Sequence, residues 1–253
     1  MKRDIIFLLF VCSVFSLIGC NRELDDDPEH EVSINFTVGS LLKATATPAE
    51  DLVNKIVLYG VDGQTMIEKY TITQLNTTQK ISKKVKSFYA IANPTSTMEN
   101  LTTVAELTNL TFDFTAATPP ASPFLMSGTG TISGTSVSIN LVRMVARIEI
   151  TCTDSKFTNA SITVSNTPRY GYVFPRTPLA VPNSCTRATN SYTNVVFPVS
   201  IYVAENTGAT LTSIKVDGQY NGAAISPSYT FNFSNNIVRN TNYPAAISFN
   251  VLP

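Results

Sequence analysis

The chain has 253 residues with 18 acidic and 18 basic side chains, so its formal net charge at pH 7 is zero. It has no basic cluster with interleaved aromatic residues, which gives little support for nucleic acid binding. The single histidine, His30, lies in an acid-rich stretch near the N-terminus. The rest of the chain therefore lacks a histidine for a Ser-His or Cys-His hydrolase or for a His-based zinc site.

Other catalytic patterns are also missing from the sequence. No C-x-x-C, G-x-S-x-G or Walker pattern occurs. A glycosidase that uses two carboxylates needs no histidine. Acidic residues after the N-terminal acid-rich stretch are few, however, and no tryptophan is present to stack on a sugar. We therefore expect a non-catalytic protein without a cofactor or a metal site.

The N-terminus has the pattern of a lipoprotein signal. Lys2 and Arg3 precede an apolar run over 5–19, which as a helix would reach only about 22 Å and is too short to span a bilayer. The run ends in Leu17-Ile-Gly-Cys20, which resembles a bacterial lipobox. We expect removal of residues 1–19 as a signal peptide and acylation of Cys20; the alternative is an ordinary signal with an incidental cysteine.

An acid-rich stretch follows Cys20, and we interpret residues 20–31 as a solvated tether. Such a composition cannot pack into a core. In lipoproteins of Bacteroides-type bacteria, acids at this place resemble a signal for export to the outer surface, although a plain spacer remains the alternative. The acidic residues are Glu23, Asp25, Asp26, Asp27, Glu29 and Glu31.

The body is rich in Thr, Ser, Asn, Val and Ile, which favours strands. Val32–Val38 alternates between apolar and polar residues and predicts a half-buried strand. An apolar run over 55–61 ends at Asp62-Gly63, which indicates a hairpin with 66–73 as the returning strand. A further strand is expected over 85–92.

One short surface helix is predicted over 98–107, where Leu101, Val104, Ala105 and Leu107 fall on one helical face. Alternation resumes at 137–141 and continues to Cys152, a stretch long enough to cross from one domain to another. Residues 168–194 hold four prolines and little periodicity, which indicates an insertion loop. The remaining strands are expected over 195–203, 211–220, 229–233 and 245–251.

These elements predict an all-β protein with two tandem β-sandwich domains, split near residue 145, over 32–145 and 146–253. Cys152 and Cys185 are the cysteines left after Cys12 is removed with the signal and Cys20 is acylated. An extracytoplasmic location would permit a disulfide between them, with two unpaired thiols as the alternative. Such a bond would stabilise the fold by roughly 3–4 kcal/mol.

An ordered set of motifs resembles the fimbrillins, the type V pilin-related lipoproteins of Bacteroides-type bacteria. The matches cover most of the chain after Cys20, and the most specific is the crossover Leu141-Val-Arg-Met-Val-Ala-Arg-Ile148. The others are Lys43–Glu50 with Val53–Tyr59, Phe88–Asn93, Phe124–Gly128 and Val238–Tyr243.

The resemblance implies two transthyretin-like sandwiches and a role in a surface fibre built by strand addition. In the family's stalk subunits a protease cuts after an arginine and removes the first strand, and a strand from the next subunit fills the groove. Here Lys43 stands at the expected cut, and the nearest upstream arginine is Arg22. We also expect the short sequence after Val238–Tyr243 to be too little to serve as a donor strand. We therefore expect a minor subunit, at the tip or the anchor of the fibre.

Arg143 and Arg147 in the crossover lie four residues apart, which keeps both on one face of a strand. They are either ordinary exposed cations or side chains that bridge the two domains by hydrogen bonds to carbonyls or carboxylates.

Two functions compete at this point. The first is a structural or adhesive subunit of a fimbria on the outer membrane, which binds other fimbrial subunits and contacts a host or bacterial surface receptor. The second is a surface glycan-binding lipoprotein of a nutrient-uptake system. Lack of tryptophan weighs against the second function, although ten tyrosines could stack on sugars.

Overall fold

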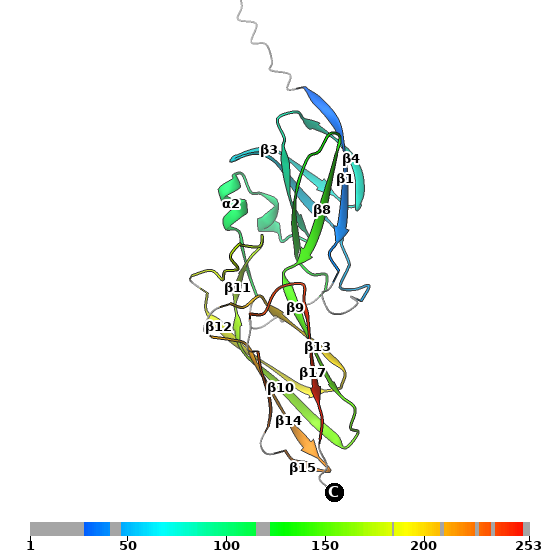
Figure 1. Ribbon diagram of the computed structural model, residues 1–253, viewed down its shortest axis with the longest axis vertical. Helices are drawn as coiled ribbons and strands as arrows, with labels where there is room; N and C mark the ends of the chain where they lie inside the picture. Colours follow the sequence, from blue (N-terminus) through cyan, green and yellow to red (C-terminus); the bar gives the residue numbers. More distant parts are fainter. Residues whose placement is uncertain are drawn as a thin grey trace, which may run out of the picture.

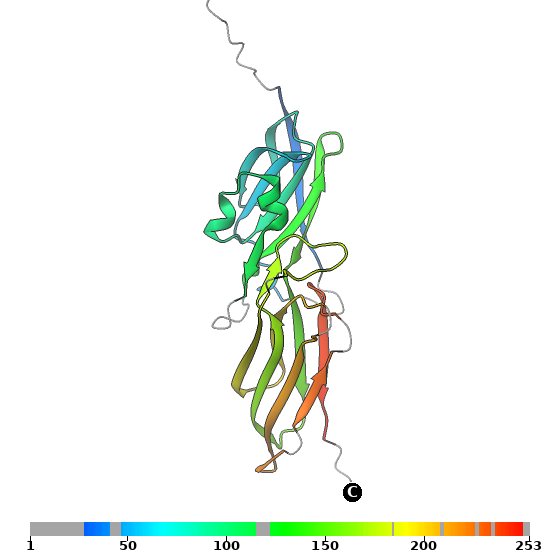
Figure 2. The same ribbon diagram turned by 90° about the vertical axis from the view of Figure 1, so that its left-hand side faces the viewer.

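The computed structural model describes residues 28–40, 47–114, 122–183, 185–207, 210–225, 228–233 and 236–249. The molecule is elongated, with two β-rich bodies stacked end to end (Figure 1, Figure 2). β1 lies in the upper body and β17 runs down the lower body in the view of Figure 1. We name these the N-terminal body and the C-terminal body.

The N-terminal body is built on one seven-stranded sheet with the order β3-β2-β5-β7-β8-β1-β4. The sheet curls, so that its two edge strands, β3 and β4, come into contact. The Glu68 carboxylate of β3 accepts hydrogen bonds of 3.1 and 3.2 Å from the backbone N–H of Ser82 in β4. The strands are β1 Glu29–Val38, β2 Ile56–Asp62, β3 Thr65–Ile72, β4 Asn76–Ser82, β5 Ser87–Ala92, β7 Met126–Thr131 and β8 Ser136–Arg143.

The helical part of this body is short. A 3-10 turn, η2, spans Ser96–Glu99, and α2 spans Val104–Asn109. Thr103 caps α2 because its hydroxyl accepts from the Glu106 N–H, while the Glu106 carboxylate accepts from the Thr103 N–H. This capping box explains why the helix expected over 98–107 is replaced by a turn and a later, shorter helix. Val104 and Leu107 are the buried residues of α2.

The C-terminal body is a sandwich of two sheets, with the orders β12-β10-β14 and β13-β9-β17; β15 and β16 both pair with β14. Its strands are β9 Val145–Cys152, β10 Phe157–Pro168, β12 Arg187–Val195, β13 Val199–Ala204, β14 Ser213–Tyr220, β15 Ala223–Ala224, β16 Tyr229–Asn232 and β17 Asn242–Ile247. Its core is separate from that of the first body and begins at Ala146 along the chain.

The two bodies are joined by more than one segment. β8 and β9 are separated by Met144, whose N–H donates to the Leu125 carbonyl at 3.0 Å. A small two-stranded sheet pairs β6 Thr111–Asp113 with β11 Tyr170–Tyr172. Val173 and Phe174, which follow β11, pack into the core of the N-terminal body. We propose a domain division at 145–146, with 170–174 contributed back to the first domain.

The structure confirms an all-β fold of two tandem sandwiches, with one short α-helix within the described ranges. It corrects two expectations. Residues 168–194 are not one insertion loop, because β11 and most of β12 lie there and pair with strands distant in sequence. Residues 29–31 are not tether, because Glu29, His30 and Glu31 pair with β4 as the first residues of β1.

Candidate assembly site at the first strand and the interdomain junction

β1 lies inside the seven-stranded sheet and not at its edge. It runs parallel to β8, from Ser33 opposite Ser136 to Val38 opposite Leu141. On its other side it runs antiparallel to β4 over Glu29–Asn35. Within the described residues β1 is the only strand that pairs with β4. Loss of β1 would therefore expose the hydrogen-bonding edge of β8 and leave β4 without a neighbouring strand.

The side chains of β1 follow the alternation that the sequence predicted. Val32 and Ile34 are 0% exposed and Phe36 is 3% exposed, whereas Ser33 and Asn35 face solvent. Burial of each such apolar side chain contributes on the order of 1.5–3 kcal/mol before entropy costs. A strand that replaced β1 would therefore have to present an apolar residue at every second position.

The chain leaves β1 through Gly39, at the contact between the two bodies. The Gly39 N–H donates to the Leu141 carbonyl at 2.7 Å. A Cβ at this position would lie only 3.2 Å from Asn240 Nδ2, so glycine permits the close approach. Asn240 Nδ2 donates to the Ser40 carbonyl at 2.7 Å. Asn240 comes from the turn before β17, so the end of β1 is held by the C-terminal body.

Arg143 is the centre of this contact and is 1% exposed. Its Nη1 donates to the Gly39 carbonyl at 2.7 Å and to Asn240 Oδ1 at 2.6 Å. Its Nε donates to the Glu50 carbonyl at 2.9 Å, and its Nη2 pairs with the Asp51 carboxylate. One guanidinium thus holds the chain on both sides of residues 41–46.

Arg147 forms the second half of the contact and is 6% exposed. Its Nη1 lies 3.1 Å from the carboxylate of Glu50, which is itself 1% exposed. Its Nε donates to Asn242 Oδ1 at 2.9 Å, and its Nη2 lies 3.4 Å from Glu149. Both arginines therefore bridge the two bodies, and neither is an exposed strand cation. We call the set Gly39, Glu50, Arg143, Arg147 and Asn240 the junction.

The junction holds the Glu50 carboxylate in its charged form. Burial raises the pKa of Glu50, but hydrogen bonds from Thr47 and Tyr202 and the charge of Arg147 outweigh it, so the pKa lies below its ordinary value. The backbone N–H of Thr47 donates to Glu50 at 2.5 Å and the Tyr202 hydroxyl donates at 3.1 Å. For Tyr202, burial and the nearby Glu50 raise the pKa to about 12.

A second buried ion pair lies beside the junction. Arg239 and Glu205 are each 5% exposed, with Nε 3.0 Å from the carboxylate. Arg239 also donates to the carbonyls of Tyr172 at 2.7 Å and Val173 at 2.9 Å. This pair fixes the turn before β17 against the segment that follows β11.

The fimbrillin-like motifs meet in space. Lys43–Glu50, Leu141–Ile148 and Val238–Tyr243 all supply residues to the junction region. The other two motifs also meet, because Asn93 Nδ2 donates to the Phe124 carbonyl at 2.8 Å. Glu50, Arg239 and Asn240 stood in these motifs but received no role from the sequence. Glu205 was missed entirely; a lone acid directly after the apolar end of β13 was the signal.

The sequence-predicted site residues have different outcomes. Cys20 and Lys43 lie outside the described residues, so acylation and cleavage stay predictions. Cys152 and Cys185 are both free thiols, and the structure does not bring them together. Cys185 Sγ lies 3.3 Å from the Tyr170 N–H beside β11, whereas Cys152 lies at the end of β9 opposite Ile247. The expected disulfide is therefore not formed.

The described residues hold neither a membrane-spanning helix nor a cluster of side chains suited to a metal ion. No helix among them has both the length and the apolar character that a bilayer span needs. No group of three or more His, Cys, Asp or Glu side chains within them is placed to hold a metal ion.

The fold is shared with known fimbrial proteins. No protein-family profile matches the chain, and no curated protein sequence is similar to it. Among solved structures, it is similar to a candidate cell adhesion protein of Bacteroides eggerthii, with a TM-score of 0.63 and 15% identity over 86% of this chain and 85% of the other.

Two structures from Porphyromonas gingivalis are similar to the same extent. The tip fimbrial protein Mfa3, truncated at its C-terminus, gives a TM-score of 0.61 at 13% identity over 88% of this chain and 96% of Mfa3. The fimbrilin FimA gives 0.59 at 13% identity over 85% and 90%. The chain therefore has the fold of fimbrillins and bacterial adhesins, as the resemblance of its motifs implied.

Proposed function

We propose that this protein is a structural and adhesive subunit of a cell-surface fimbria that joins its neighbours by β-strand addition. The observation that carries the proposal is β1, a strand inside the sheet whose inner face is apolar from Val32 to Val38, with the candidate cut at Lys43 five residues after its end. The fold shared with fimbrial proteins supports it.

The geometry defines what an incoming strand must supply. It would bond to the edge of β8 on one side and to β4 on the other. It would fill the spaces of Val32, Ile34 and Phe36 with apolar side chains. It would also place a backbone carbonyl where the Gly39 oxygen now accepts from Arg143, because a buried donor without a partner costs about 1–3 kcal/mol.

We propose a minor position in the fibre, at its tip or its anchor. Lys43 stands where the fimbrillin resemblance places the arginine of stalk subunits, so an Arg-specific protease would leave β1 in its sheet. A sheet that keeps β1 has no open slot to accept a strand, so the subunit would join a neighbour only by donating a strand and would end the fibre. The competing outcome is a Lys-tolerant protease that removes β1 and makes this a stalk subunit.

N-terminal sequencing of the cell-bound and the surface-released protein tests the position. We expect a mature chain that keeps residues 29–38 and forms no multimers resistant to mild heating in detergent. A Lys43→Arg variant should gain a chain that starts at Ala44 together with such multimers, while a Lys43→Gln control should not. A wild-type chain that starts at Ala44 and forms a ladder of multimers contradicts the minor position.

We also propose that Cys20 carries the lipid that anchors the protein in the outer membrane, facing the cell surface. The Leu17–Cys20 sequence at the end of the apolar run supports this. A Cys20→Ala variant should leave the membrane fraction or remain unprocessed. Unchanged partition of this variant into the detergent phase would contradict the anchor.

A further inference from the structure

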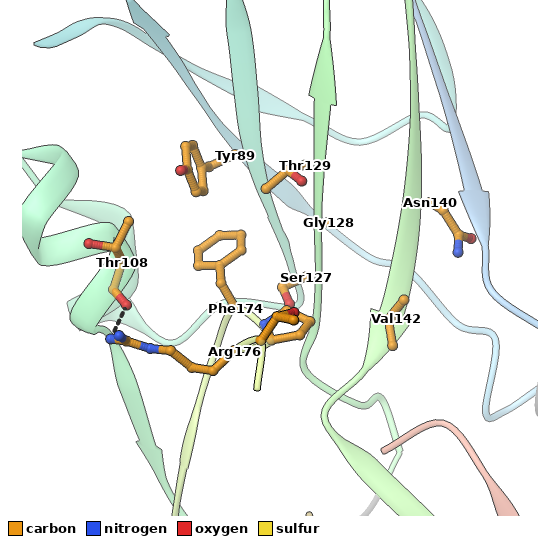
Figure 3. Close-up of a pocket in the computed structure, with 11 residues that line it drawn as sticks. Tyr89, Thr108, Ser127, Gly128, Thr129, Asn140, Val142, Phe174 and Arg176 are labelled. Carbon is orange, nitrogen blue, oxygen red and sulfur yellow. Dashed lines mark hydrogen bonds between the residues drawn. The ribbon is translucent and has the colours of Figure 1, made fainter. Parts of the chain in front are cut away.

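A cleft of about 550 Å³ opens on the outer face of the sheet of the N-terminal body. Its floor is formed by β5, β7 and β8, and its wall by the segment 174–177 that follows β11 (Figure 3). Pockets of this volume are typical of small-molecule sites.

The floor is hollow because β7 carries glycine where it meets β8. A Cβ at Gly128 would lie 2.3 Å from the Asn140 carbonyl, a distance that no side chain permits. The wall is fixed by aromatic contact: the rings of Phe174 and Tyr89 meet edge to face at 5.0 Å, and Phe174 is 6% exposed. The cleft is therefore formed by closely packed strands and a packed aromatic ring.

Arg176 gives the cleft its charge, since no other Lys or Arg and no carboxylate lines it. Its guanidinium lies 4.1 Å from the centre of the Tyr172 ring, and its Nη2 donates to the Thr108 carbonyl at 2.8 Å and to Asn109 Oδ1 at 2.9 Å. Both acceptors are neutral, and among the described residues no carboxylate lies within ion-pair distance of Arg176. The charge is held in place and is not neutralised.

Neutral polar groups continue along the cleft from this charge. Figure 3 shows Arg176 at the end next to α2, with Thr129 beyond Phe174 and Asn140 at the far margin on β8. Thr129 and Asn140 are exposed, and Tyr89 brings a phenolic hydroxyl. Within the described residues the hydroxyls of Tyr89 and Thr129 have no hydrogen-bond partner, while that of Ser127 is bonded to the Val173 carbonyl at 2.5 Å.

This combination selects the ligand by its chemistry. One fixed guanidinium favours a single carboxylate, which accepts paired hydrogen bonds from Arg. A row of hydroxyl and amide groups with aromatic rings favours a ligand that has many hydroxyls and an apolar ring face. The lack of carboxylates in the lining disfavours a cation.

We propose that this cleft binds a carboxylate-bearing saccharide, with the acid group on Arg176 and sugar hydroxyls on Tyr89 and Thr129. The site would make the subunit an adhesin for sialylated or uronic-acid glycans. This proposal rests on the proposed surface location but not on strand addition, because no residue that lines the cleft belongs to β1 or to the junction.

Calorimetric titration of the purified full-length protein tests the cleft. The probes are sialyllactose and trigalacturonate, each with its methyl ester as a neutral counterpart, and a triglutamate peptide of similar charge. We expect one acidic saccharide to bind at least about tenfold more tightly than its ester, because a hydrogen-bonded charge is lost. Equal binding of acid and ester, or no binding of any saccharide, overturns the proposal. Tighter binding of triglutamate than of either saccharide assigns the cleft to acidic peptides instead and also overturns it.

Variants separate the cleft from a general effect of charge. Arg176→Gln should weaken binding about tenfold or more, and Arg176→Lys should restore part of it. Arg187→Gln is the matched control, since Arg187 also donates to two neutral acceptors, the Asn166 carbonyl and Asn206 Oδ1, but in the C-terminal body. Tyr89→Phe keeps the ring contact with Phe174 and should weaken binding about threefold. If Arg176→Gln and Arg187→Gln change the affinity equally, the site is not this cleft.

Discussion

β1 and β17 are the corresponding strands of the two bodies, yet they differ in how the sheet holds them. Each runs parallel to one half of the crossover, β1 beside β8 and β17 beside β9. β1 has a second partner in β4, whereas β17 ends its sheet order and, among the residues that the structure describes, pairs with β9 alone. β17 also contains Pro244, a residue tolerated at sheet edges.

The difference teaches where strand exchange could occur. Removal of β1 would open a slot with two hydrogen-bonding walls and an apolar floor, which a strand from another subunit can fill. Removal of β17 would only narrow a sandwich by its edge strand. The junction lies between the two strands, with Arg143 on the end of β1 and Arg147 on the start of β17. The predictions below test how unequal the two strands are and how the junction couples them.

The largest loss of stability is expected from Arg147→Met. This variant leaves the Glu50 carboxylate, 1% exposed, without the nearest cation of its site. Removal of one partner from a buried ion pair typically costs about 3–5 kcal/mol. Urea unfolding should show this loss, while the control Lys215→Met, which breaks an exposed pair with Asp217, should cost about 1 kcal/mol or less. A loss at Arg147 no larger than that of the control would mean that the junction does not hold the bodies together.

Ile34→Ala and Ile247→Ala compare the two strands directly. Both isoleucines are buried, at 0% and 4% exposed, but Ile34 lies in a strand with two neighbouring strands and Ile247 in one with a single neighbour in the described part of the chain. Truncation of a buried isoleucine costs about 2–5 kcal/mol, and within this range we expect Ile34→Ala to cost more than Ile247→Ala. The denaturant midpoints of the two variants, compared with that of the wild type, measure the two stability losses. An equal or reversed order would remove the energetic distinction between β1 and β17.

Acid should weaken the junction through Glu50. Its pKa lies below the ordinary value of 4.5, so its ionised form stabilises the fold above that pH and the stabilisation disappears as the pH falls through the lowered pKa. Glu50→Gln should therefore be less stable than the wild type at pH 7, with a difference that narrows as the pH falls below 4.5. Thermal unfolding of both proteins from pH 7 to pH 3 measures this difference. A difference that stays constant or widens in acid would contradict the charge state that the geometry requires.

The sequence predicts β1 well because its pattern is local: apolar and polar residues alternate over Val32–Val38, and the buried set is the one that alternation selects. It places the start of the strand too late, since the pairing of Glu29–Glu31 with Ser82, Ile81 and Lys80 depends on a distant segment. β11 was missed for the same reason, because three residues next to prolines carry no periodicity and gain their structure only from β6.

The junction was predictable in part. The sequence placed Arg143 and Arg147 on one face of a single strand and offered a bridge between domains as one of two possibilities. The structure places them in two strands, β8 and β9, and their acceptors show that both bridge the bodies. The acceptors themselves were not predictable, because Gly39 and Glu50 lie far from Asn240 along the chain and the three meet only after both bodies fold. The cleft at Arg176 shares this property, since its lining comes from three strands, α2 and a proline-rich segment.

The smallest loss of stability is expected from Asn240→Gly, at the place where the C-terminal body holds the end of β1. Asn240 has a φ of +55°, which glycine also adopts readily, so Asn240→Gly removes the bonds to Arg143 and Ser40 without backbone strain. We expect a loss of about 1–2 kcal/mol in urea unfolding, since a buried charge-assisted hydrogen bond is among those removed. Asn221→Gly is the matched control, because Asn221 has a φ of +50° in an exposed turn and its replacement should change stability by about 0.5 kcal/mol or less. Equal effects of the two variants would show that Asn240 serves only the turn before β17, and that Arg143 anchors β1 without help from the C-terminal body.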